Sequence, residues 1–141
     1  MKISHYMTPK VISAHPEDGI RKTFFLMREH SIRHIPVLDE NRRLIGIISD
    51  RDLRRPEWVE ESLDVSHVYN LDDNLAVKDL MTTDVKVVYT YDSIKKANRF
   101  FIDHRFGALP VLNKEEELVG MLSAIDVLRA FEDYMVKRPL K

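Results

Sequence analysis

The feature that most constrains this chain is a duplication: residues 7–55 align without a gap on residues 81–129, a displacement of 74 positions. The alignment contains 15 identical pairs out of 49, whereas unrelated sequences of average composition would share about 3. The matches include a Met-Thr pair, a Pro-Val-Leu run and the pattern G-x-x-S-x-x-D. A fold that satisfies this sequence must therefore contain the same unit twice.

Each copy predicts the element order β-α-β-β-α. A short apolar segment follows each Met-Thr pair, at 11–13 and at 85–88, and we expect it to form a strand. Asp18 and Asp92 then stand where an acid can cap a helix, and apolar residues recur near the 3.6-residue period after each of them.

The second half of each copy holds two strand-like runs and the start of another helix. In the first copy "HIPVLD" and "LIGIIS" are joined by the polar "ENRR", and in the second "ALPVLN" and "LVGMLS" are joined by "KEEE". We expect a helix to begin after each pair, near Asp50 and near Ala124.

The repeat divides the chain into four parts. We assign repeat 1 to 1–55, an acidic and partly helical linker to 56–78, repeat 2 to 79–135 and a basic tail to 136–141. A sheet of about three strands with two helices leaves one apolar face open, so two copies should cover each other. The predicted fold class is α/β (α+β), with the two repeats packed about a pseudo-two-fold axis.

Composition narrows the functional classes. The net charge is −1 and the pI is about 6.6, which argues against a nucleic-acid partner or a basic membrane-binding patch. There is no cysteine, which suits a reducing cytoplasm. No apolar run approaches the roughly 18 residues of a membrane span. We therefore expect a cytoplasmic protein without a membrane partner.

The S-x-x-D pattern has two interpretations. In the first, Ser49 with Asp52, and Ser123 with Asp126, form capping boxes at helix starts and need no ligand. In the second, the helix start binds a phosphate, the serine adds a hydrogen bond and the aspartate accepts the hydroxyls of a ribose. On this second interpretation the glycine three residues upstream lets a ligand lie against bare backbone.

Taken together, these motifs resemble a tandem pair of cystathionine-β-synthase (CBS) domains, a Bateman module. The resemblance rests on three features that are present in both copies: the Met-Thr pair, the apolar-Pro-Val strand and the G-x-x-S-x-x-D ending. The chain is similar to stand-alone CBS pairs, including those of the acetoin-utilisation type. The resemblance implies a regulatory module that binds an adenosine compound in clefts between the copies, forms a homodimer and acts on a regulated protein that the sequence does not identify.

The resemblance also implies ligands and site residues. The expected ligand is AMP, ADP or ATP, with S-adenosylmethionine or NAD as further candidates, and no cofactor is expected. Aspartates would hold ribose, serines and basic residues would face phosphate, and apolar residues would wall the base. The implied nucleotide-binding residues are Ser49, Asp52, Arg51, Arg33, His34, Val11, Ile35, Pro36, Ser123, Asp126, Val85, Leu109 and Pro110.

The two sites should differ in charge. Copy one has Arg33, His34 and Arg51, whereas copy two has Gly107, Ala108 and Ile125 at the equivalent positions. We therefore expect a polyphosphate site built mainly on copy one, and in copy two a site that is weaker, empty or suited to a less charged adenosyl group.

Enzymatic function is not expected. The chain has no phosphate loop of the G-x-x-x-x-G-K-S/T type and no G-x-S-x-G elbow, and Ser49 has no evident base partner in the sequence. His30 and His34 are four residues apart, but the strand pattern places His34 outside the helix, so no metal site is expected. The alternative to a regulatory module is a dimerisation scaffold without a ligand.

Overall fold

A computed structural model describes residues 1–53 and 75–137. The chain forms two compact units: one comprises Ile12–Val85 and the other Met1–Val11 with Lys86–Lys141. We call them the Ser49 unit and the Ser123 unit, after the serine of the S-x-x-D pattern in each. The units do not follow the repeat boundaries, because the first eleven residues belong with repeat 2. Of the predicted linker at 56–78, residues 56–74 lie outside the described residues, and the last two residues begin a short helix, Val77–Leu80.

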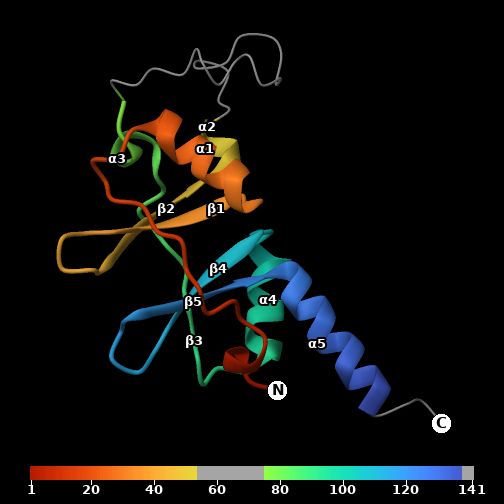
Figure 1. The fold of residues 1–141 in the computed structure, drawn as a ribbon. Helices are drawn as coiled ribbons and strands as arrows, with labels where there is room; N and C mark the ends of the chain where they lie inside the picture. The colour runs from red at the N-terminus through yellow and green to blue at the C-terminus, as the bar shows by residue number, and fades with distance from the viewer. Residues whose placement is uncertain (54–74, 138–141) are drawn as a thin grey trace. The chain divides into compact units, whose positions relative to one another are not determined.

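The Ser49 unit is built on an antiparallel pair of strands (Figure 1). β1 (His34–Leu38) pairs with β2 (Leu44–Ser49), with His34 opposite Ser49 at one end and Leu38 opposite Leu44 at the other. Helix α1 (Ile20–His30) lies against this pair, and the short helices α2 (Asp50–Leu53) and α3 (Val77–Leu80) complete the unit (Figure 1). The core includes Ile20, Phe24, Met27, Ile35, Val37, Ile48, Leu53, Val77 and Leu80.

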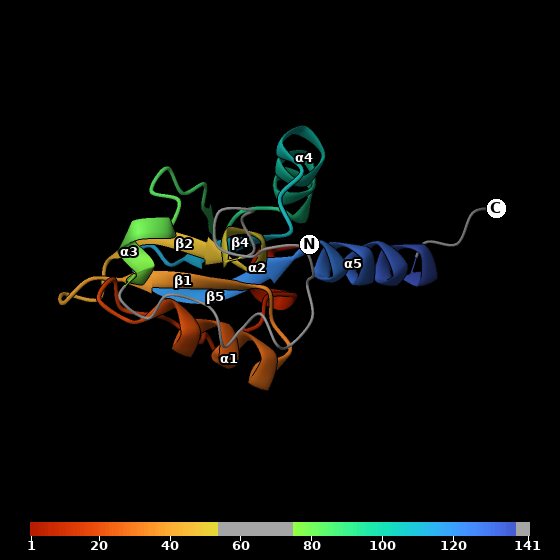
Figure 2. The ribbon, with the colours of Figure 1, turned by 90° about the horizontal axis from the view of Figure 1, so that it is seen from above.

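The Ser123 unit has a three-stranded sheet of order β3-β4-β5. β3 (Val88–Tyr89) runs parallel to β4 (Ala108–Leu112), which pairs antiparallel with β5 (Leu118–Ser123). The other elements are the 3-10 helix η1 (Ile3–His5), α4 (Ile94–His104) and α5 (Ala124–Lys137). In Figures 1 and 2, α5 continues from the end of β5 and extends beyond the strands of its unit. The core includes Ile3, Val88, Ile94, Ala97, Leu109, Val111, Leu122, Val127 and Ala130.

The predicted order β-α-β-β-α is complete in the second repeat and reduced in the first. The strand expected at 11–13 is absent, and in its place Ala14 makes a single parallel bridge to Val37. The equivalent Val88 pairs with Val111 within β3, which begins three residues later than the strand expected from Val85. The predictions of strands at 11–13 and from Val85 were therefore wrong in position.

Proline explains why the first strand of repeat 1 stops at one bridge. In the second repeat the Thr90 N–H donates to the Leu112 carbonyl at 3.0 Å and lengthens the ladder. Pro16 occupies the position equivalent to Thr90, and a proline nitrogen carries no hydrogen to donate. The ladder therefore ends at Ala14.

The predicted helix caps were wrong by one residue. The N-caps are Gly19 for α1 and Ser93 for α4, and the Ser93 hydroxyl accepts the Lys96 N–H. The carboxylates of Asp18 and Asp92 instead accept the N–H three residues upstream, each at 2.9 Å. Each aspartate thus closes the turn that leads into the helix. The second helices begin at Asp50 and Ala124, as the sequence predicted.

Candidate functional site

The S-x-x-D pattern forms a capping box in both units. At the start of α2, the Ser49 N–H donates to Asp52 Oδ2 at 2.8 Å and the Asp52 N–H donates to Ser49 Oγ at 3.2 Å. The corresponding distances for Ser123 and Asp126 are 2.9 and 3.2 Å. The first interpretation of the pattern is therefore confirmed. The capping box does not test the second interpretation, in which the aspartate accepts the hydroxyls of a ribose.

The glycines upstream have a packing role, which corrects the interpretation that they admit a ligand. A Cβ built on Gly46 would lie 2.5 Å from Met81 Sδ and 3.1 Å from the Thr82 carbonyl oxygen. A Cβ on Gly120 would lie 2.6 Å from Met7 Sδ and 3.0 Å from the carbonyl oxygen of the following threonine. The space beside each glycine is filled by a Met-Thr pair, so a ligand cannot occupy it.

Each Met-Thr pair is held by a two-way backbone bridge. Ile47 and Thr82 exchange N–H···O hydrogen bonds of 2.9 Å in both directions, and Thr8 and Met121 exchange bonds of 2.8 and 3.0 Å. The opening segment of each repeat thus packs on the second strand of the other repeat. The sequence contained the signal, because the Met-Thr pair and the glycine recur at the same offset, but it did not show that the two touch.

In the Ser49 unit, the structure brings the predicted polar residues to one end of the strand pair. His34 lies opposite Ser49, and the Asp50 N–H donates to the Arg33 carbonyl at 2.8 Å. This bond ties the start of β1 to the start of α2, on which Asp52 lies. Arg33 is exposed and His34 is half-buried, so both can be reached from solvent. Arg51, also exposed, is on the first turn of α2.

The Ser123 unit has the same frame without the basic side chains. Ala108 lies opposite Ser123, and the Ala124 N–H donates to the Gly107 carbonyl at 3.3 Å. Asp126 is only 5% exposed, and its Oδ1 lies 3.4 Å from Arg129 Nη1. The polar residues of this unit are therefore placed as in the other unit, but the positive charges of Arg33 and Arg51 are missing.

The predicted apolar residues fall into two groups. Ile35 and Leu109 are 0% and 1% exposed and belong to the cores of their units. The strand prolines, Pro36 and Pro110, are buried as well. The half-buried Val11 and Val85 retain surface that a ligand could contact, and each belongs to the unit of the opposite repeat.

His34 has an altered protonation equilibrium. Burial lowers the pKa of its imidazole below the usual 6.5, because the charged form loses hydration. The carboxylates of Asp52 and Asp50 act in the opposite direction, and the Arg33 guanidinium acts with burial. The net shift is downward, so the ring is mostly neutral at pH 7.

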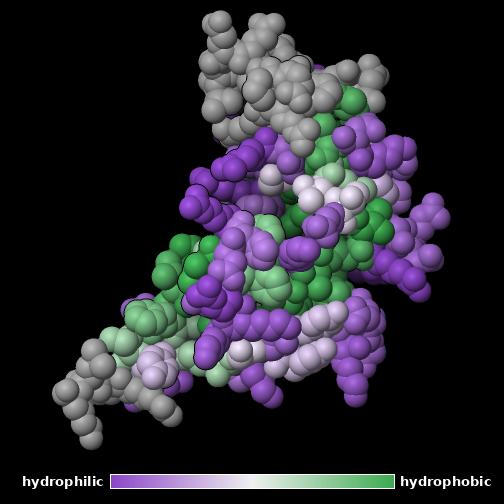
Figure 3. Space-filling model, turned by 180° about the vertical axis from the view of Figure 1, so that it is seen from behind, coloured by the Kyte–Doolittle hydropathy of each residue, from purple (hydrophilic) through white to green (hydrophobic). Residues whose placement is uncertain are grey.

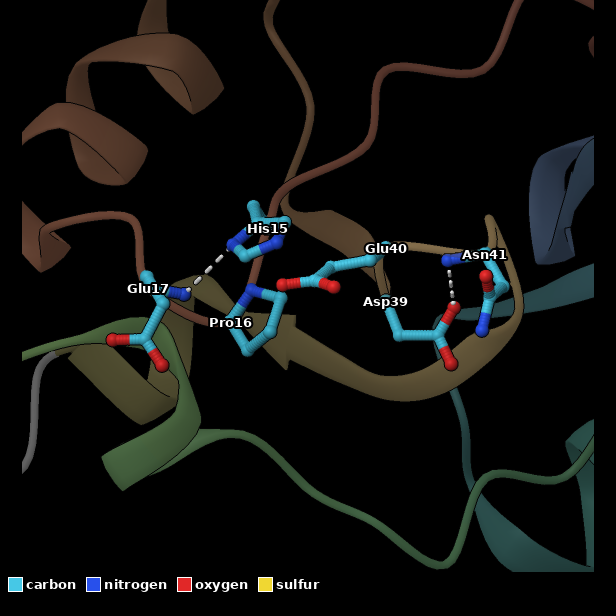
Figure 4. A pocket seen from close by; sticks show the side chains of 6 residues that line it. All are labelled: His15, Pro16, Glu17, Asp39, Glu40 and Asn41. Atoms are coloured by element: carbon cyan, nitrogen blue, oxygen red, sulfur yellow. Dashed lines mark hydrogen bonds between the residues drawn. The ribbon is translucent and has the colours of Figure 1, made fainter.

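A separate pocket lies at the other end of the β1–β2 pair. It has a volume of about 310 Å³ and is lined by His15, Pro16, Glu17, Asp39, Glu40 and Asn41 (Figure 4). In each wall a backbone N–H donates to a side chain: the Asn41 N–H donates to Asp39 Oδ1 at 2.8 Å, and the Glu17 N–H donates to His15 Nδ1 at 3.2 Å (Figure 4). Its three carboxylates disfavour a phosphate, and it contains none of the predicted nucleotide-binding residues.

Two further searches cover only the parts of the chain that the structure describes. In residues 1–53 and 75–137, no group of three or more His, Asp or Glu side chains is arranged to hold a metal ion. Within the same ranges, no helix combines the length and the hydropathy that crossing a bilayer requires.

The duplicated frame, with its paired capping boxes and crossed Met-Thr segments, is that of a tandem CBS pair. The sequence profile of the CBS domain matches residues 3–57 and 77–133, so the chain belongs to the CBS-domain family. Protein MJ0188 of Methanocaldococcus jannaschii is 31% identical over 132 residues, which are 92% of this chain and 44% of that protein. Inosine-5'-monophosphate dehydrogenase of Korarchaeum cryptofilum is 32% identical over 83% of this chain and 21% of its own length. The chain thus spans less than half of either relative.

Solved structures of CBS pairs share the fold over nearly the whole chain. CBSX2 of Arabidopsis thaliana, in complex with AMP, is 29% identical with a TM-score of 0.77 and 97% and 98% coverage of the two chains. The acetoin utilisation protein AcuB of Vibrio cholerae is 26% identical, with a TM-score of 0.76 and coverage of 100% and 98%. The cytosolic domain of the Mg²⁺ channel MgtE, in complex with ATP, is 25% identical, with a TM-score of 0.72 and coverage of 92% and 48%. CBS pairs similar to this chain therefore bind adenine nucleotides.

Proposed function

We propose that this chain is a regulatory module that binds an adenine nucleotide and transmits the bound state to a protein partner. The observation that carries the proposal is the grouping in the Ser49 unit, where a serine and an aspartate at a helix start adjoin two basic residues. These are the groups that a ribose and a phosphate require. The AMP complex of CBSX2 supports the choice of ligand.

The proposal includes an order of preference among ligands. Arg33, His34 and Arg51 favour phosphates in the Ser49 unit, so AMP, ADP and ATP are the expected ligands there. The Ser123 unit has Ala108 and Ile125 in place of two of them, and Ile125 is 56% exposed. An uncharged or cationic adenosyl group, such as that of S-adenosylmethionine, suits this second site better than a polyphosphate does.

The proposal treats the module as non-catalytic and cytoplasmic, and as a homodimer. Helix α5 supports the dimer, because Leu128 and Phe131 are each 60% exposed and Met135 is 36% exposed on the same face. Figure 3 shows hydrophobic side chains at the surface in the region of this helix. Large apolar side chains at helical spacing on a surface are typical of an association interface, and a second copy of this chain is the partner we propose.

A ligand titration tests the proposal. Thermal shift and calorimetry with AMP, ADP, ATP, NAD and S-adenosylmethionine should find a nucleotide that, at 100 times its Kd, raises the free energy of unfolding by about 2.7 kcal/mol. Asp52→Asn should remove most of this increase, since it removes the charge but retains an oxygen for the cap. Asp18→Asn is the matched control, because Asp18 also accepts a backbone N–H at 2.9 Å and is outside the proposed site.

The alternative, a dimerisation scaffold, is favoured by the capping boxes, which account for both Ser-Asp pairs without a ligand. Under this alternative Asp52→Asn lowers only the baseline stability, and none of the five compounds stabilises the wild type at millimolar concentration. That pair of results would reject the regulatory proposal.

A further inference from the structure

The position of His34 relative to α2 is fixed by backbone structure. His34 begins β1 directly opposite Ser49, and the residue before it accepts the Asp50 N–H at 2.8 Å. Because β2 leads directly into α2, the imidazole lies beside the turn that carries the capping box. The Ser49, Asp50 and Asp52 N–H groups all donate within the protein, so a phosphate here would be bound through the basic side chains that flank the turn, and it would lie near the ring.

The charges around the ring leave its protonation sensitive to a ligand. Among the described residues, those that act on His34 are Asp52 and Asp50 on α2 and Arg33, which directly precedes β1. The two carboxylates favour the imidazolium, but burial outweighs them and keeps the pKa below 6.5. A further negative group beside the ring would reinforce the carboxylates and raise that pKa.

We propose that His34 couples phosphate binding to pH, taking up one proton from solvent when the phosphate of a nucleotide binds beside it. The inference rests on the proposed function and adds a regulatory property to the same site. The neutral ring can accept the proton at its unprotonated nitrogen and then donates a charge-assisted hydrogen bond to the phosphate. No other bond forms or breaks.

Linkage fixes the direction of the effect. Since the nucleotide-bound form has the higher pKa, it binds more protons than the free form at every pH between the two values. Affinity therefore rises as pH falls, by up to about tenfold for each pH unit within that window. Above the window the ring is neutral in both forms, so its protonation adds nothing to affinity.

The second repeat provides a comparison within the same chain. Its position equivalent to His34 is Ala108, which lies opposite Ser123 in the same register. A ligand bound in the Ser123 unit has no imidazole at this place and should show no such proton uptake. The same alignment shows that this fold accepts alanine at the position, so His34→Ala is a suitable variant as well as His34→Gln.

The experiment measures AMP affinity by calorimetry between pH 5.5 and 8.0, in pairs of buffers that differ in ionisation enthalpy. The variants are His34→Gln and His34→Ala, with His30→Gln as the control, since His30 is exposed at the end of α1 in the same unit. The phosphate of free AMP also titrates in this range, and that contribution is the same for all four proteins. The difference between wild type and variant therefore gives the protonation that depends on His34, on the ring and on the phosphate bound beside it.

We expect the ratio of wild-type to His34→Gln affinity to increase at least threefold from pH 8.0 to pH 6.0, with His34→Ala agreeing and His30→Gln following the wild type. Proton uptake on binding should be larger for the wild type than for either His34 variant. Parallel pH profiles for all four proteins, with AMP bound, would overturn this inference alone. Failure of the wild type to bind any adenine nucleotide at any pH would overturn both this inference and the proposed function.

Discussion

Replacement of Gly46 by alanine tests the packing of the Met-Thr segment most directly. The new Cβ would lie 2.5 Å from Met81 Sδ, where ordinary contact begins at 3.4 Å, so the sulfur must move by about 0.9 Å. The Thr82 carbonyl oxygen, at 3.1 Å, must also yield, and it is held by the Ile47 N–H at 2.9 Å. Overpacking of this kind costs about 1–3 kcal/mol. The free energy of unfolding should fall by that amount, and the melting temperature by roughly 2–4 °C for each kcal/mol lost.

A double-mutant cycle with Met81→Ala separates the steric clash from other effects. Met81→Ala alone should destabilise the protein by about 1–3 kcal/mol, since the side chain is half-buried against the core. In the double variant the sulfur that obstructs the new Cβ is gone, so the combined loss should be smaller than the sum by about 1–2 kcal/mol. Urea denaturation, followed by circular dichroism, measures all four corners of the cycle.

Gly19→Ala is the matched control, because a Cβ there meets nothing within 4 Å and the backbone has a φ of −72°. Because Gly19 is the N-cap of α1, the change should cost at most about 1 kcal/mol, the ordinary difference between glycine and alanine at an N-cap, with no steric contribution. Strict additivity in the Gly46–Met81 cycle, or a neutral Gly46→Ala, would refute the packing explanation. The presence of glycine at position 46 would then need another explanation, such as the close approach of a ligand.

Three further predictions follow from other parts of the structure. The pKa of His34 is lower in the folded protein than its unfolded value of about 6.5, so between these two values the unfolded state binds more protons. The urea midpoint should therefore fall as the pH decreases from 6.5, and His34→Gln should make the midpoint less dependent on pH. Leu128→Asp should convert the proposed dimer to a monomer in sedimentation velocity, and an unchanged mass would contradict the α5 interface. Ser93→Ala should cost about 1 kcal/mol in thermal unfolding, because it removes the hydroxyl that accepts the Lys96 N–H, and an equal loss for Asn would show that the cap is not the cause.

Much of the local structure could be predicted from the sequence because its causes are local. The periodicity of Ile20, Phe24 and Met27 predicted the buried face of α1, and all three side chains are buried. The S-x-x-D spacing predicted the capping boxes, since a capping box joins residues only three positions apart. Pro16 explains why the first strand of repeat 1 is reduced to a single bridge, and the errors at Asp18 and Asp92 came from a turn whose hydrogen bonds the pattern does not distinguish from a cap.

The tertiary structure alone decided what the Met-Thr pairs and the glycines do. Gly46 meets Met81, 35 positions away, and Gly120 meets Met7, 113 positions away. Neither contact has a local signature, because the need for a small residue arises only when two distant backbones approach each other. The sequence therefore determined that one unit is built twice and where the second helix of each repeat begins. Packing between distant segments determined that each unit contains the opening segment of the other repeat. Only a folded chain brings those backbones within contact distance.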